Sequence, residues 1–389
     1  MKTVFFGPFI GEFGWEYLYW HAWVNNLCIS DYKSFNKIVS SFPGRESFYP
    51  YADEYWPHPD ELLSELKSCN GYITDYWING FPRPNTSINQ KFMGLIPYEK
   101  WKFQEQDTSQ IPVIKTVGKL LEKYKSKLPQ DTTFFTPFKK CTFNDFNFGV
   151  IHSLSPKNDN EIKQIPIPFS KQNFELLKAT KKAEQLIKNY LNDEEKLIAI
   201  YPRNRLLRRT DKNWSKEKYL KLIEYFKLNF PEYRIGIFGS PQQAYFDGGV
   251  PNGTIDFINL PNTERMNIQI AALKQAKLAV GSLSGAVLVS RAAGVPTLSW
   301  GLQRDAKRFY NENRNNIETI FHPIQNPKPE DIMKLSTSIL KKTNNYERGF
   351  DKWSSINHLN YGNGNLESKF QMVLNFFRSI FYAKNKNFE

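Results

Sequence analysis

The residues that decide the fold lie between Lys196 and Gly301: KLIAIYPRNRLLRRTDKNWSKEKYLKLIEYF (196–226), RIGIFGSPQQ (234–243) and AKLAVGSLSGAVLVSRAAGVPTLSWG (276–301). Short apolar runs bounded by Gly or Pro alternate here with segments whose apolar residues recur at helical spacing. The runs predict buried strands at 197–201, 235–238, 278–280 and 297–300. Alternating strands and helices indicate parallel β-α-β units, with helices on both faces of a sheet.

Polar and glycine residues follow three of these strands, at 203–212, 239–240 and 281–285. Because the carboxyl ends of parallel strands meet at one edge, ligands of such sheets bind in the crevice beyond that edge. We therefore expect the functional site there.

The turn Gly281-Ser282-Leu283-Ser284-Gly285 follows a predicted strand and opens a helix of small residues. A glycine-rich turn at a helix N-terminus presents backbone N–H groups and the positive end of the helix dipole, which favours phosphate binding. Small residues at this place also let a helix pack closely on a strand. Both interpretations stay open.

A basic run follows the strand at 197–201, namely Arg203, Arg205, Arg208, Arg209 and Lys212. Guanidinium groups bind phosphate oxygens in pairs, and a lysine adds a point charge. A solvated basic loop is the alternative, and we expect it to apply to at least two of the five.

The segment Lys212-Asn213-Trp214-Ser215, followed by Tyr219, resembles a lysine–any–tryptophan–proline segment of the ADP-heptose lipopolysaccharide heptosyltransferases. Phe238-Gly239 and the run 281–301 are similar to that family's later strand–turn–helix–strand signature. The resemblance implies an α/β fold with two Rossmann-like domains facing across a cleft (GT-B) and a C-terminal helix that packs back on the first domain. It also implies a nucleotide-sugar donor as co-substrate, no cofactor and no obligatory metal.

By this resemblance Lys212 contacts the donor phosphates, and Ser284-Gly285 line the pyrophosphate turn. Two positions depart from the family pattern, because Leu283 replaces its acidic residue and Leu288 its histidine. The full set of expected donor-phosphate residues is Arg203, Arg205, Arg208, Lys212, Ser282, Ser284 and Gly285. The expected donor-nucleoside residues are Gly239, Ser240 and Gln242, at the place where the family carries an acidic residue for the ribose.

The chain begins with a predicted strand at 3–6, which runs into GPFIGEFGWE (7–16) and a strongly aromatic helix at 15–27. In the resembling family a glycine and an acidic catalytic base occupy this turn, and Gly11-Glu12 matches them. Glu16 is the alternative base, unless it only favours the helix dipole. The expected acceptor-binding residues are Gly11, Trp15 and His21, and His21 is alternatively a helix-face residue with a satisfied hydrogen bond.

The remaining sequence predicts three regions: an acceptor-binding domain at 1–175, a nucleotide-sugar-binding domain at 190–345 and a helical tail at 346–389. The expected elements are strands at 35–40, 149–153 and 317–321, helices at 113–124, 172–189 and 331–342, and loop-rich stretches at 42–102 and 134–148. The tail carries an apolar stripe with basic flanks. Packing on the first domain and contact with an anionic membrane are both consistent with this stripe.

Composition limits the partners. Lys+Arg 52 against Asp+Glu 39 gives a net charge of +13, which favours nucleotide-sugars, anionic membrane surfaces or nucleic acid. An AT-biased genome also produces such lysine abundance. Three separated cysteines indicate a reducing compartment, no apolar run spans a bilayer, and no DxD triplet indicates a metal-dependent donor site. We expect a cytoplasmic protein, with peripheral contact at the inner membrane face as an option.

Together with the resemblance, the sequence predicts a glycosyltransferase that moves a sugar from a nucleoside diphosphate to a hydroxyl of a glycan or lipid-linked glycan. The resemblance further implies that transfer proceeds with inversion and without a metal. Three alternatives stay open. They are a phage-type DNA-base glycosyltransferase, a sugar-nucleotide epimerase, and a non-catalytic sugar-nucleotide-binding protein on the same fold.

Overall fold

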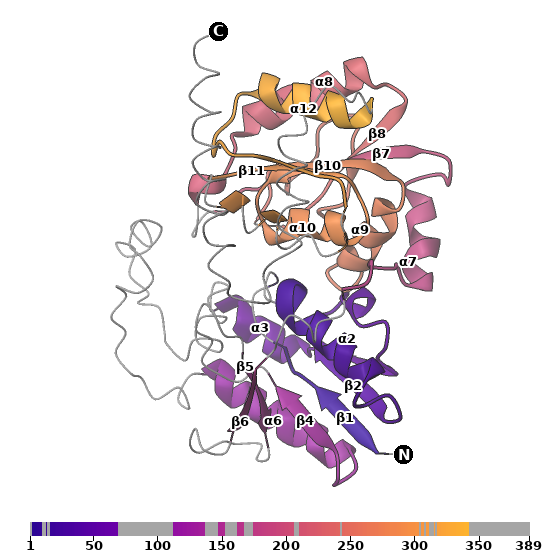
Figure 1. The fold of residues 1–389 in the computed structure, drawn as a ribbon, viewed down its shortest axis with the longest axis vertical. Helices are drawn as coiled ribbons and strands as arrows, with labels where there is room; N and C mark the ends of the chain where they lie inside the picture. The colour runs from indigo at the N-terminus through magenta and orange to yellow at the C-terminus, as the bar shows by residue number, and fades with distance from the viewer. Residues whose placement is uncertain are drawn as a thin grey trace, which may run out of the picture.

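The computed structural model describes residues 2–9, 13, 16–68, 112–136, 147–151, 162–166, 174–205, 210–241, 243–302, 305–306, 309–310, 315 and 317–341. They form two six-stranded sheets, one from each half of the chain, with helices packed on them (Figure 1). The expected α/β architecture is therefore confirmed. The expected helical tail, 346–389, lies outside the described residues.

The first sheet has the strand order β3-β2-β1-β4-β5-β6. Its first four members pair in parallel, whereas β5 and β6 run antiparallel at one edge. The strands are β1 (Thr3–Phe6), β2 (Asn36–Ser41), β3 (Glu54–Pro57), β4 (Thr133–Thr136), β5 (Asn147–Ile151) and β6 (Ile162–Pro166). The helices are η1 (Glu16–Trp20, a π-helical turn), α2 (His21–Ile29), η2 (Glu46–Phe48), α3 (Asp60–Ser68) and α6 (Pro112–Lys127).

The central strand β1 shows how the first core is built. Successive side chains of a strand point to opposite faces of the sheet. Phe5 accordingly contacts Tyr124 of α6, with ring centroids 5.2 Å apart, while Phe6 stacks on Phe135 at 5.3 Å. Trp23 of α2 meets Phe135 edge-on. Trp23 of α2 therefore covers one face of the sheet.

The second sheet is parallel throughout, in the order β12-β11-β10-β7-β8-β9. Its strands are β7 (Lys196–Tyr201), β8 (Tyr233–Ile237), β9 (Ile255–Asp256), β10 (Ala276–Ser282), β11 (Thr297–Trp300) and β12 (Thr319–His322). Its helices are α7 (Lys181–Leu186), η7 (Ile187–Asn189), η8 (Thr210–Lys212), α8 (Lys216–Asn229), α9 (Arg265–Leu273), α10 (Gly285–Ala292) and α12 (Pro329–Leu340).

The strand order reverses between β7 and β10, because the chain proceeds from β7 to β8 on one side and continues with β10 on the other. Helices α8 and α12 cover one face of this sheet, whereas α9 and α10 lie between the sheet and the first domain (Figure 1). The reversal point is the usual ligand crevice of an open parallel sheet. The carboxyl ends of β7 and β10 flank it.

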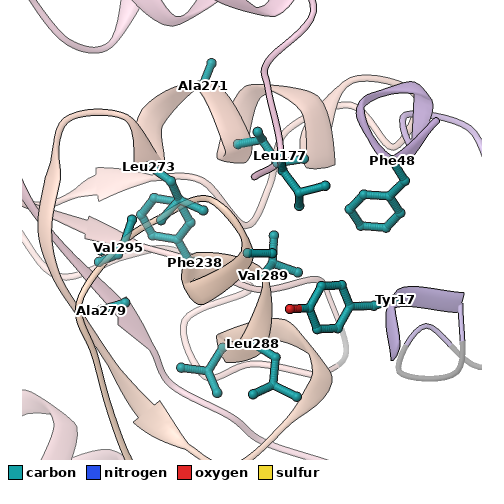
Figure 2. Close-up of a cluster of buried hydrophobic side chains, with 14 of the residues drawn as sticks. Tyr17, Phe48, Leu177, Phe238, Ala271, Leu273, Ala279, Leu288, Val289 and Val295 are labelled. Carbon is teal, nitrogen blue, oxygen red and sulfur yellow. The ribbon is translucent and has the colours of Figure 1, made fainter. Parts of the chain in front are cut away.

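The two domains share an apolar contact. Tyr17 and Phe48 of the first domain lie beside Leu288 and Val289 of α10, with Leu177 of the connecting segment completing the group (Figure 2). All five belong to one continuous cluster of buried residues. Large apolar interfaces hold domains in a fixed relation, so this contact sets how the two sheets face each other.

One expected element was wrong. The segment 172–189 is not one charged helix, because residues 174–180 have no regular structure and α7 begins at Lys181, after Thr180 caps it by accepting from the Ala183 amide. In the stretch 134–148, which was expected to be loop-rich, β4 occupies the start and pairs with β1, and residues 137–146 lie outside the described residues. The strands expected at 3–6 and 297–300 have those bounds in the structure.

Candidate functional site

The segments that follow β7 and β10 lie at the reversal point of the second sheet. Asn213 organises the first of them. Its side-chain oxygen accepts from the guanidinium of Arg203 and from the Arg205 amide at 3.0 Å, and its side-chain nitrogen donates to the Arg205 carbonyl at 2.8 Å. This one amide therefore fixes the backbone at Arg205, at the end of the described residues 203–205 of the basic run. Arg203 is buried and Arg205 is half-buried.

Lys212 connects this loop to the segment after β11, where Asp305 lies. Its ammonium lies 3.0 Å from Asp305 Oδ2, and only 13% and 16% of the two side chains are exposed. A β-carbon on Gly301 would lie 3.5 Å from that same Oδ2 and 3.7 Å from Leu283 Cβ. The ammonium of Lys212 and the turn 281–285 consequently converge on one place.

The turn itself ends β10 and starts α10. Ser284 has extended backbone angles and caps the helix, its hydroxyl accepting from the Val287 amide at 3.5 Å. The first amides of α10 and the positive end of its dipole are directed to the carboxyl edge. Ser282 is buried, so its side chain is not presented at the surface of the turn.

Close packing explains the first glycine of this turn. A β-carbon on Gly281 would lie 2.7 Å from Tyr201 Cβ and 2.9 Å from the Tyr201 carbonyl oxygen, closer than side chains approach. The Ser290 hydroxyl also donates to Tyr201 Oη at 2.6 Å and so ties α10 to β7. For Gly281 the packing interpretation therefore holds, and phosphate binding stays a prediction for the residues after it.

The turn after β8 is fixed by α9. Gly239 has a φ of +143°, and its carbonyl accepts from Gln269 Nε2 at 2.8 Å. The Ser240 carbonyl accepts from the Gln243 amide at 3.2 Å. Gly239 and Ser240 thus lie at the expected edge in an ordered turn.

In the first domain, Glu16 is fully buried and accepts three hydrogen bonds, from Ser41 Oγ, the Arg45 guanidinium and Tyr49 Oη, the last at 2.6 Å. A carboxylate enclosed in this way is an anchor for the chain and is not presented to a substrate hydroxyl. A catalytic base must be reached by the acceptor hydroxyl, and the buried, triply bonded Glu16 differs from that expectation.

Arg45 is the cation of this buried group. Its guanidinium carbon lies 5.0 Å from the ring centre of Phe13 and 4.2 Å from that of Phe42. Burial lowers its pKa to about 10. Arg45 therefore holds both Glu16 and Phe13, the two described residues on either side of positions 14 and 15.

His21 lies inside the first domain. Its Nδ1 is 3.1 Å from the Glu16 carbonyl oxygen, its ring stacks on Tyr17, and burial lowers its pKa to about 3. The imidazole is therefore neutral and enclosed, which agrees with the structural alternative. The expected site residues Gly11, Glu12, Trp15, Arg208 and Gln242 lie outside the described residues.

Sequence reasoning gave no role to Asn213, Asp305 or Arg45. Asn213 stands beside Lys212 in the segment that carries the family resemblance, and this position was a usable signal. Nothing in the sequence pairs Asp305 with Lys212 or Arg45 with Glu16, because each pair meets only through the tertiary fold.

Within the described ranges, no three His, Cys, Asp or Glu side chains are grouped so as to hold a metal ion. None of the helices in the described part of the chain is long and apolar enough to cross a membrane.

The site and fold define a two-domain α/β protein with basic residues at the carboxyl edge of its second sheet. No protein-family model and no curated protein matches the chain. Among solved structures, it resembles a glycosyl transferase family 9 protein from Veillonella parvula, at 12% identity and TM-score 0.45, over 88% of this chain and 97% of that chain. It also resembles E. coli ADP-heptose lps heptosyltransferase II, at 13% identity and TM-score 0.46, over 88% and 99% of the two chains. The E. coli heptosyltransferase WaaC with ADP-2-deoxy-2-fluoro heptose is similar at 10% identity and TM-score 0.39, over 87% and 99%.

Proposed function

We propose that this protein is a glycosyltransferase that takes a sugar from a nucleoside diphosphate and transfers it to a hydroxyl of a glycan or lipid-linked glycan. The observation that carries the proposal is the convergence of Lys212, held by Asp305, on the turn that opens α10. A diphosphate needs several positive or N–H donors from different segments, and this crevice offers an ammonium, the Asn213-ordered basic loop and a helix N-terminus.

The reaction would be a direct displacement. The acceptor oxygen forms a bond to the anomeric carbon while the bond from that carbon to the phosphate oxygen breaks, and the nucleoside diphosphate leaves with the electron pair. The acceptor proton goes to a carboxylate, for which Glu12 is our candidate by family resemblance. Charge develops on the leaving diphosphate, and preorganised positive groups such as Lys212 stabilise it where it appears.

The test begins with a panel of ADP-, GDP- and UDP-sugars, each incubated with the protein and analysed for acceptor-independent hydrolysis. Glu12→Gln should keep nucleoside diphosphate affinity while lowering turnover roughly 10²- to 10⁴-fold, because it removes the proton acceptor. Glu224→Gln, at an exposed position of α8, is the matched control and should leave turnover unchanged. Equal turnover of the Glu12 variant and the wild type would remove Glu12 from the mechanism.

A non-catalytic nucleotide-sugar-binding protein is the second candidate. It is favoured by Leu283 and Leu288, which are buried apolar residues where the resembling family carries an acidic residue and a histidine. Binding of a nucleoside diphosphate without hydrolysis or transfer across the whole panel would support this candidate over the enzyme.

A further inference from the structure

The carboxylate of Asp305 stands beside the place where the proposed diphosphate would bind. Lys212 is its one ion-pair partner among the residues that the structure describes, and Oδ2, the atom that faces Lys212, also lies against Gly301. The two side chains are 13% and 16% exposed, but Asp305 Oδ2 is enclosed, so a ligand would meet Asp305 through its other carboxylate oxygen, Oδ1. An ammonium held in this way presents positive charge on one side and a carboxylate on the other.

The Lys212 ammonium and the Asp305 carboxylate favour different parts of a ligand. A carboxylate a few ångströms from a diphosphate repels it, and in a partly buried place that repulsion is weakly screened. Ionised carboxylates accept hydrogen bonds and donate none. The ligand group beside Asp305 must therefore be an uncharged donor, and sugar hydroxyls have this chemistry.

The side chains of the neighbouring turn do not offer an equivalent acceptor. Leu283 is apolar, and the Ser284 hydroxyl already accepts from the Val287 amide as the helix cap. Ser282 is buried. Asp305 is an anionic acceptor beside this turn, because a β-carbon on Gly301 would lie 3.5 Å from its Oδ2 and 3.7 Å from Leu283 Cβ.

We propose that Asp305 determines donor specificity by accepting a hydrogen bond from a hydroxyl of the donor sugar, and that it favours uncharged, hydroxyl-rich sugars over uronic acids. This inference rests on the proposed function. Lys212 binds the diphosphate while remaining next to Asp305. The two members of one ion pair therefore bind different parts of the donor: Lys212 the diphosphate and Asp305 the sugar.

Titration calorimetry with ADP, GDP and UDP first identifies the nucleoside diphosphate that the wild type binds. The same nucleotide is then tested as its hexose and as its hexuronic acid form. Wild type should prefer the hexose form by about tenfold or more, since hydrogen bonds to a charged acceptor are strong and a second carboxylate is repelled. In Asp305→Asn this preference should shrink to within roughly threefold, with equal or tighter binding of the bare nucleoside diphosphate.

Asp211→Asn is the control, because it removes an exposed carboxylate adjacent to Lys212 in sequence while leaving Asp305 in place. It should keep the hexose preference of the wild type. Two results would overturn the inference: an unchanged preference in Asp305→Asn, or a loss of bare nucleoside diphosphate binding as large as that in Lys212→Met, which would mean that Asp305 only supports Lys212. A wild type that binds none of the three nucleoside diphosphates instead removes the proposed function, and the inference with it.

Discussion

Asn267 of the second domain accepts a hydrogen bond from the Ser47 hydroxyl of the first, at 2.8 Å. Its side-chain nitrogen donates to Glu46 Oε2 at 2.6 Å, so one buried amide bonds two of the three residues of η2. Two positions further along α9, Gln269 holds the turn at Gly239. Helix α9 thus touches the first domain and the candidate nucleoside turn at once.

Replacing Asn267 by Ala should lower the free energy of unfolding by about 1–3 kcal/mol, because buried polar groups of η2 lose their partner. Urea unfolding measures the change. Asn229→Ala is the control: Asn229 lies at the end of α8 and bonds only a carbonyl of its own helix, so its effect should stay within about 0.5 kcal/mol. Equal stability of the two variants would mean that the interdomain amide contributes nothing.

The buried pair Arg45–Glu16 gives a second stability prediction. Arg45→Met leaves the Glu16 carboxylate buried without its cation and should cost about 3–5 kcal/mol. Adding Glu16→Gln removes the uncompensated charge and keeps an acceptor for Ser41 and Tyr49, so the double variant should recover much of the loss.

Urea unfolding of both single variants and the double variant completes the cycle. Arg234→Met, which breaks an exposed pair with Glu195, should cost less than about 1 kcal/mol. An additive cycle, with the double variant as unstable as the two single losses together, would contradict coupling between Arg45 and Glu16.

Two buried histidines predict loss of stability in acid. Burial lowers the pKa of His21 and of His58 to about 3, from the ordinary 6.5 that the unfolded chain retains. Below pH 6.5 the unfolded chain binds protons that the folded protein does not. Stability is therefore complete above about pH 6.5 and falls as the pH drops towards 3, by about 1.4 kcal/mol per pH unit for each histidine.

His58→Gln tests this directly, because the glutamine amide can still donate to the Phe9 carbonyl that His58 Nε2 contacts at 2.6 Å. His21→Asn similarly replaces the Nδ1 group. Urea unfolding at pH 7 and pH 5 should show a smaller acid-induced loss in each variant than in the wild type. The same pH dependence in all three proteins would show that neither histidine is the cause.

The basic loop gives a prediction on binding. Asn213→Ala removes three contacts to Arg203 and Arg205 and should weaken binding of the cognate nucleoside diphosphate about tenfold, with the fold retained, since the loop loses its fixed geometry. Calorimetry gives the affinity, and Asn229→Ala again serves as the control. Unchanged affinity in Asn213→Ala would place the diphosphate away from this loop.

The second sheet was predictable because its strands are short apolar runs with clear glycine and proline boundaries, as at 297–300. The strand β4 was missed because it has only four residues, too few for a clear pattern. It forms because Phe134 and Phe135 pack beside β1, which is distant in sequence. Thr180 is a residue type that commonly caps helix N-termini, and it indicates that α7 begins at Lys181. The helix expected at 172–189 should therefore have been placed to begin after Thr180.

The site was predictable in part. Parallel strands bring the segments after their carboxyl ends to one edge, so Lys212, Gly239 and Ser284 were expected there from topology alone. Ion pairs such as Lys212–Asp305 depend on where loops fold back over that edge. Periodicity carries no information on such loops, so the sequence pattern left Asp305 without a role.

A substitution at Gly281, near the end of β10, distinguishes a packing role of this glycine from a role in ligand binding. Gly281→Ala places a methyl group against Tyr201 and should lower the free energy of unfolding by about 1–3 kcal/mol through overpacking. Gly248→Ala is the matched control, because no atom lies within 4 Å of its added β-carbon, and it should be neutral or slightly stabilising. Nucleoside diphosphate affinity of folded Gly281→Ala should equal that of the wild type. A variant that keeps its stability but loses that affinity would reverse the assignment and make Gly281 part of the anion-binding turn.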